Sequence, residues 1–169
     1  VSPEMIRQGS ILALVPTWFL AVYLLVVMLV PLTRRAWQRM GMASFWVLVA
    51  AAIAVDVARF WDGHRPAVGW LNYVLVWTAV HQLGYLWRAS RVLGPVQALL
   101  WSAAGLGILV LLVTAAGYPV SMITVPGEAI SNSRPPSLAL LCLAVFHGGL
   151  VILLESPLRR WLKRPRPWT

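Results

Sequence analysis

Five long apolar runs dominate this chain of 169 residues. A transmembrane α-helix needs about 20 consecutive apolar residues, because the hydrocarbon core of a bilayer is roughly 30 Å thick. Backbone polar groups in that core must be bonded within their own segment, so such runs form helices. The sequence therefore predicts an all-α, polytopic transmembrane helix bundle with about five spans, at residues 11–33, 41–61, 69–87, 95–116 and 138–155.

The composition supports a membrane protein. Hydrophobic residues make up 60% of the chain and charged residues 11%, whereas an ordinary soluble domain has roughly 25% charged residues. The net charge of +9 would suggest nucleic acid in a soluble protein. Here the basic residues form short clusters between the runs and leave no basic face. We therefore expect a multi-pass protein of the cell membrane, with the lipid bilayer as partner and no nucleic acid.

Metal and cofactor sites are not indicated. Cys142 is the single cysteine, so no internal disulfide is possible, and no Cys/His spacing suits a metal. We interpret Cys142 as a small buried hydrophobic residue, and we expect no bound metal or cofactor.

The basic residues predict the orientation. Ten of the 14 Lys and Arg residues fall in the first and third connections and in the C-terminal tail. The other side holds Arg7, Arg65 and Arg134, with Arg59 at a helix end. The positive-inside rule then places the N-terminus outside and the C-terminus in the cytoplasm. The Pro-rich segment 117–137 becomes an extracytoplasmic loop.

Placing an ionisable side chain in hydrocarbon costs free energy, so we expect each one inside the runs to have a partner or a function. Asp56 and Arg59 are three residues apart and lie on one side of the second helix. They form either a paired site for a substrate or a neighbouring helix, or a self-neutralising pair with Arg59 reaching to water. His81 lies about 16 Å into the third run, where a histidine could move a proton or bond a neighbouring helix. These three residues are the catalytic candidates.

Other polar side chains are candidates for substrate binding. Asn72 falls on the opposite face of the third helix from His81, so the two do not form one site by themselves. Structural alternatives are an interhelical hydrogen bond for Gln82 and a packed, hydrogen-bonded His147 beside a close helix contact. Glu155 is expected to pair with Arg159 or Arg160. The substrate-binding candidates are Asn72, Gln82, His147, Asn132 and Arg134.

Several stretches together resemble a known family. They read PTWFLAVYLLVV at Pro16–Val27, GWLNYVLVWTAVHQLGYLWR at Gly69–Arg88, SNSRPPSLALLCLA at Ser131–Ala144 and PLRRWL at Pro157–Leu162. They are similar to the later part of actinobacterial members of the acyltransferase 3 family, the membrane O-acyltransferases. Arginine outnumbers lysine thirteen to one, a bias that also suggests a GC-rich bacterial coding sequence.

The resemblance implies an all-helical membrane enzyme of about ten spans. Such an enzyme takes an acyl group from a cytoplasmic donor, often acyl-CoA, to a hydroxyl of a sugar, glycan or lipid-linked acceptor. The family carries a basic residue about eleven positions before a histidine in an early span. None of His64, His81 and His147 fits that pattern, so no catalytic residue is carried over.

Five spans with an outside N-terminus lead us to expect the C-terminal half of such an acyltransferase. The missing N-terminal half would then be its partner, and Val1 would reflect an internal or alternative start. The alternative is a non-catalytic membrane scaffold or transporter subunit, which explains the scarcity of catalytic groups equally well.

Overall fold

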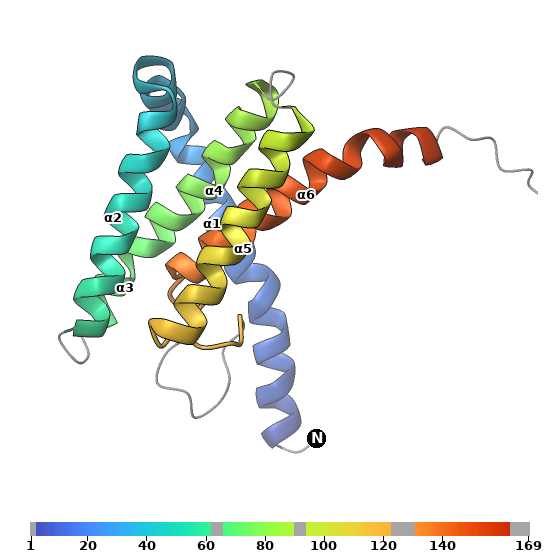
Figure 1. Cartoon of the computed structure of the whole chain (residues 1–169). Coiled ribbons are helices and arrows are strands. Elements are labelled where there is room, and N and C mark those ends of the chain that lie inside the picture. Colours follow the sequence, from blue (N-terminus) through green and yellow to red (C-terminus); the bar gives the residue numbers. More distant parts are fainter. Residues whose placement is uncertain (1–2, 62–65, 90–93, 123–130, 163–169) are drawn as a thin grey trace, which may run out of the picture.

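A computed structural model describes residues 3–61, 66–89, 94–122 and 131–162. Apart from one isolated bridge between Ser133 and Pro136, these ranges hold no β structure, so the all-α prediction is confirmed. Figure 1 shows the helices in chain order: α1 (Pro3–Met40), α2 (Met42–Trp61), α3 (Pro66–Gly69), α4 (Leu71–Ala89), α5 (Pro95–Ala115) and α6 (Leu138–Leu162).

Helix α1 extends beyond the predicted run at both ends. We expected a basic connection after residue 33, but the helix continues through Arg34 and Arg35 to Met40. Arginine is a good helix former, and these guanidinium groups are exposed at the end of the helix. The break comes at Gly41, whose φ of 55° belongs to the left-handed region that ends helices. The first basic cluster is therefore the last turns of α1.

Helix α6 is also longer than predicted. It continues past residue 155 to Leu162 and includes Pro157. Arg159 Nε lies 2.9 Å from Glu155 Oε1 one turn earlier, which confirms the expected pairing at this end. The predicted turn at 62–66 lies mostly outside the described residues, because only Pro66 is described, as the start of α3. The basic residues at positions 91, 163, 164 and 166 also lie outside them.

Helix α4 lies at the centre of the bundle. It packs against α1, α2 and α6, while α5 runs along α6. The main core cluster joins Phe45 and Ala52 of α2, Val76 and Ala79 of α4, and Leu141 of α6. The helices α1, α2 and α6 therefore surround α4 and bury much of its surface.

Small residues bring α5 and α6 into close contact. A Cβ added at Gly105 would lie 2.8 Å from the backbone nitrogen of Phe146. A Cβ at Gly149 would lie 2.7 Å from the carbonyl oxygen of Ala98. Ser102 Oγ donates to the carbonyl oxygen of Phe146 at 2.8 Å. This is the small-residue packing that membrane helices use in place of a hydrophobic driving force.

The outer surface is apolar. Large hydrophobic side chains such as Met28, Leu100 and Leu111 are exposed on α1 and α5. Among the described residues, four segments are long and apolar enough to cross a membrane: Phe19–Met40, Met42–Phe60, Pro95–Ala115 and Leu138–Leu162. Such outward faces are compatible with lipid, whereas in water they would promote aggregation.

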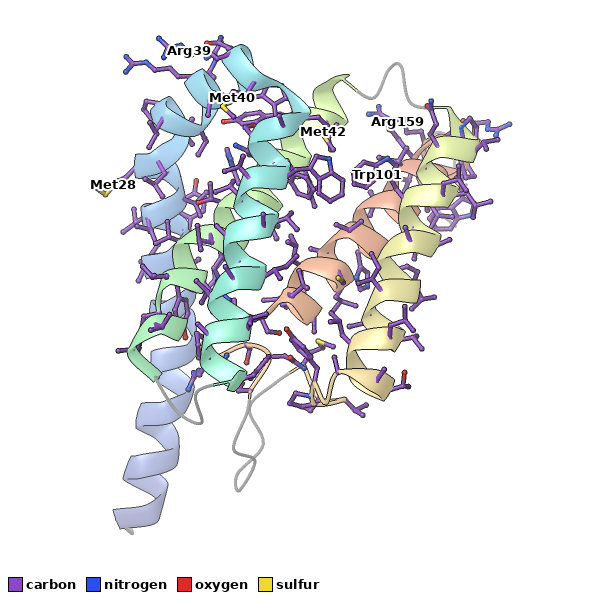
Figure 2. All side chains as sticks on the ribbon, turned by 60° about the vertical axis from the view of Figure 1, so that its left-hand side comes forward. Met28, Arg39, Met40, Met42, Trp101 and Arg159 are labelled. Atoms are coloured by element: carbon purple, nitrogen blue, oxygen red, sulfur yellow. The ribbon has the colours of Figure 1, made fainter. Side chains whose placement is uncertain are left out.

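The remaining predicted span, 69–87, corresponds to α4, which is long enough to cross but carries more polar residues. It holds Asn72, Thr78 and Gln82, and all three are buried. A helix surrounded by three others can carry polar groups that a lipid-facing helix cannot. Five crossings and the orientation of the termini stay predictions. The structure does place Arg39 of α1 and Arg159 of α6 at the same end of the bundle (Figure 2).

Candidate functional site

A buried carboxylate organises one end of the bundle. Asp56, near the end of α2, is 1% exposed. Its Oδ1 accepts a hydrogen bond of 2.8 Å from Asn72 Nδ2 of α4. Its Oδ2 accepts one of 3.0 Å from the Tyr118 hydroxyl and one of 2.7 Å from the backbone N–H of Leu138. One side chain thus joins α2, α4, the segment after α5 and the start of α6.

The partner of the Asp56 charge is the N-terminus of α6. Leu138 is the first residue of that helix, and the carbonyl oxygen of Ser137 accepts from the N–H groups of Leu140 and Leu141. A helix N-terminus carries free N–H groups and a partial positive charge, so it stabilises an anion. This explains how a carboxylate can be buried here without an arginine in contact.

Arg59 and Asp56 attract each other electrostatically but form no direct salt bridge. Within the described residues, Arg59 Nη1 instead donates to the carbonyl oxygen of Pro135 at 3.5 Å. Gly69 makes room for this contact, because a Cβ there would lie 2.6 Å from Pro135 Cγ and 3.3 Å from Arg59 Cδ. The neighbouring Arg134 is exposed.

Asn132 holds the two described ends of the 117–137 loop together. Its Nδ2 donates to the carbonyl oxygens of Pro119 at 2.7 Å and Ser121 at 3.0 Å. Its Oδ1 accepts from Ser137 Oγ at 2.7 Å. Asn132 is fully buried. We call this cluster the polar junction: Asp56, Asn72, Tyr118, Asn132 and Ser137.

The Tyr118 hydroxyl is a stable donor within the polar junction. Its burial, together with the nearby charge of Asp56, raises the pKa of Tyr118 well above its usual range. The phenol therefore keeps its proton and continues to donate to Asp56 at any physiological pH. Phe60 packs edge-on against the Tyr118 ring with centroids 4.9 Å apart, which helps to hold the hydroxyl in place.

The structure brings five of the eight candidate residues to this end. Asp56, Asn72 and Asn132 belong to the polar junction, and Arg59 and Arg134 border it through Pro135. Asn72 Oδ1 is buried and has no hydrogen-bond partner in the described part of the chain. Both carboxylate oxygens of Asp56 thus accept hydrogen bonds, whereas the amide oxygen of Asn72 accepts none from the described residues.

His81 and Gln82 lie elsewhere, about 14 Å along α4 from Asn72. Gln82 Oε1 accepts from Ser44 Oγ of α2 at 3.1 Å, so the interhelical interpretation of Gln82 is confirmed. His81 packs edge-on against Tyr85 with centroids 5.1 Å apart. The Tyr85 hydroxyl lies 3.1 Å from Thr33 Oγ1 of α1. His81 Nδ1 is buried without a hydrogen-bond partner among the described residues.

His147 is on the outside of α6. Its side chain is exposed, and its Nδ1 lies 2.9 Å from the carbonyl oxygen of Leu143 in the same helix. The expected hydrogen bond is present, but the expectation of a packed histidine is wrong. The close helix contact nearby is made by Gly149, which faces α5 while His147 faces away.

Sequence reasoning missed two members of the polar junction. Tyr118 follows Gly117, whose φ of 73° turns the chain back after α5. Ser137 directly precedes the last apolar run, and a serine in that place is a common signal for the start of a helix. In the described ranges, no three His, Cys, Asp or Glu residues lie close enough to hold a metal ion.

Comparison with known protein families finds a match for this chain. A search of curated proteins finds no match, and a search of solved structures finds none. Residues 5–168 match the acyltransferase 3 family, whose pattern is described as an acyltransferase domain. That match covers almost the whole chain and agrees with an all-α bundle with apolar outer faces. The chain belongs to the acyltransferase 3 family of membrane proteins.

Proposed function

We propose that this chain transfers an acyl group from a thioester donor, such as acyl-CoA, to a hydroxyl of a sugar, glycan or lipid-linked acceptor. The family match across residues 5–168 carries this proposal. The bundle's apolar exterior supports a multi-pass protein of the cell membrane, where a soluble donor can meet a membrane-bound or extracytoplasmic acceptor.

The proposed reaction is an ester-forming exchange. The acceptor's hydroxyl oxygen attacks the thioester carbonyl, a C–O bond forms and the C–S bond breaks. The hydroxyl proton ends on the departing thiolate, so a general base must carry it in between. Of the described histidines, His81 suits this role better, because its ring packs against Tyr85 and its Nδ1 is buried, while His147 faces outward.

Asp56 has a different role in this proposal. Its carboxylate accepts three hydrogen bonds and is almost fully buried, which leaves little capacity to take a proton from a substrate. We assign Asp56 as a positioning residue that fixes the 131–137 segment against α2 and α4. Asn132, which is buried, and Arg134, which is exposed, are then held at this end of the bundle.

A second function has its own support. A non-catalytic scaffold or transporter subunit would need stable interhelical contacts and no reactive site. The saturated Asp56 and the Ser44–Gln82 hydrogen bond fit that description. Under this alternative, His81 would be a packing residue.

Reconstituted vesicles can separate the two functions. The chain is incorporated into lipid vesicles and supplied with acetyl-, octanoyl- or palmitoyl-CoA and with hydroxyl acceptors such as a hexose and a lipid-linked sugar. Acyl transfer predicts release of free thiol together with an acceptor heavier by one acyl group. If folded protein releases no more thiol than empty vesicles with every pair, the acyltransferase proposal fails and the scaffold function is favoured.

A further inference from the structure

A deep apolar groove separates α2 from α5. It has a volume of about 440 Å³, within the range of small-molecule sites. One wall runs from Trp46 to Ile53 on α2, the other from Leu100 to Ile108 on α5, and α6 forms the floor from Leu138 to Val145. The backbones of α2 and α5 stay apart and only aromatic side chains join them near one end, so the groove lies open between the two helices (Figure 2).

The length of the groove suits a hydrocarbon chain of medium length. Its walls cover eight residues of α2 and nine of α5, which is about 12–14 Å of helix length. A single extended hydrocarbon chain of octanoyl or decanoyl length fits this space.

Stacked tryptophans border one end of the groove. The Trp46 and Trp101 rings are stacked with centroids 6.2 Å apart, and Trp101 also meets Phe45 edge-on at 6.3 Å. These rings bridge α2 and α5 at the end of the bundle where α2 and α5 begin. Trp and Tyr favour the boundary between hydrocarbon and water, so this end suits the point where a chain meets its headgroup.

The same end of the bundle is basic. Arg39 of α1 and Arg159 of α6 lie there with Trp101 (Figure 2). Arg34, Arg35 and Arg160 are exposed on the same last turns of α1 and α6. Arg159 shares its charge with Glu155, which leaves a strong positive excess. An amphiphile with a polyanionic head and an apolar tail therefore matches both parts of this surface.

We propose that this groove binds the hydrocarbon chain of the acyl donor, with the donor's anionic headgroup against the basic end. The proposal rests on the acyltransferase function above and adds a preference for chains longer than acetyl. Contact along the groove would stabilise each added methylene until the chain reaches Leu138.

Two neighbouring alanines provide a matched test. Ala104 lines the groove. Ala103, the residue before it in α5, is exposed and does not line the groove. Ala104→Trp would fill the groove, and Ala103→Trp would add the same side chain outside it. Transfer from acetyl-CoA and octanoyl-CoA is measured for wild type and both variants in vesicles.

We expect Ala104→Trp to lower octanoyl transfer by at least about tenfold while acetyl transfer stays near wild type. Ala103→Trp should leave both rates unchanged. Equal octanoyl rates in the two variants and wild type would overturn the groove proposal and leave the acyltransferase proposal intact.

A second readout works even if no transfer occurs. Octanoyl-CoA bearing a photoreactive diazirine on its chain is crosslinked to the protein, and the labelled residues are mapped. Label on groove residues in wild type and Ala103→Trp, but not in Ala104→Trp, supports the proposal independently of activity. A photoreactive phospholipid serves as the second arm. If it labels the groove and octanoyl-CoA does not displace it, the groove holds bilayer lipid and the proposal is wrong.

Discussion

The carboxylate of Asp56 accepts a 2.7 Å hydrogen bond from the backbone N–H of Leu138, a residue 82 positions later in the chain. This contact places a buried negative charge at the start of α6, where the helix dipole stabilises it. Asn72 and Tyr118 complete the coordination of the same carboxylate. Through Asp56 both ends of the Pro-rich loop are fastened to α2, at Tyr118 and Leu138, which lie 62 and 82 positions later.

Removing this charge should destabilise the bundle. Asp56→Ala leaves three buried donors without an acceptor, and we expect it to lower the free energy of unfolding by about 3 kcal/mol or more. Asp56→Asn should lower the free energy of unfolding by less, because its one amide oxygen can still accept hydrogen bonds. Melting temperature in detergent measures the effect. Val57→Ala, on the exposed side of the same helix, is the control, and equal melting temperatures for Asp56→Ala and Val57→Ala would contradict the assigned role.

Much of the helical architecture could be predicted because apolar run length is a local property. The predicted spans 41–61 and 95–116 agree with α2 and α5 to within about a turn. Helix ends were less predictable, since Arg34 and Arg35 favour a helix as readily as they mark a loop. The exact end depended on Gly41.

The candidate site was predictable in its members but not in its connections. The i,i+3 spacing suggested that Asp56 and Arg59 would pair. The N-terminus of α6 offered the carboxylate a backbone donor, and the carbonyl of Pro135 offered Arg59 an acceptor. Both partners lie far away in sequence, and no periodic pattern records them. Tyr118 was missed for the same reason, as it reaches Asp56 across 62 positions.

The glycines of α5 should differ sharply in their tolerance of alanine. Gly105→Ala would place a Cβ against the Phe146 nitrogen and the Cys142 carbonyl oxygen, both under 3 Å away. We expect it to destabilise the bundle by about 1–3 kcal/mol, because helix backbones must separate. Gly107 has nothing within 4 Å of the added Cβ, so Gly107→Ala should be neutral or stabilising by less than about 1 kcal/mol. Thermal unfolding of the two variants in the same detergent tests this, and an equal loss in both would rule out the close contact as the cause.

Substitutions of the two described histidines should distinguish a catalytic role from a packing role. If His81 carries the proton in acyl transfer, His81→Ala lowers the transfer rate by about 10²-fold or more without a matching loss of melting temperature. His147→Ala should change neither, since His147 is exposed and bonds within its own helix. Transfer rate and melting temperature are measured on the same preparations. A His81→Ala protein that transfers at the wild-type rate would make His81 a packing residue and leave the base unassigned.

The crossing of α4 can be tested with single cysteines at the two ends of the bundle. Cys142 is buried, so the wild-type chain should react poorly with a membrane-impermeant maleimide. Gln38→Cys lies in the exposed last turns of α1, and Val120→Cys is 80% exposed after α5. Three helices, α2, α4 and α5, separate these positions. If all three cross, the two cysteines lie on opposite sides; if α4 stays on one side, they lie on the same side.

The positive-inside rule further predicts that Val120→Cys labels in intact cells and that Gln38→Cys labels only after permeabilisation. Labelling of both in intact cells, or of neither, would contradict five crossings, and the reverse pattern would keep five crossings while inverting the orientation.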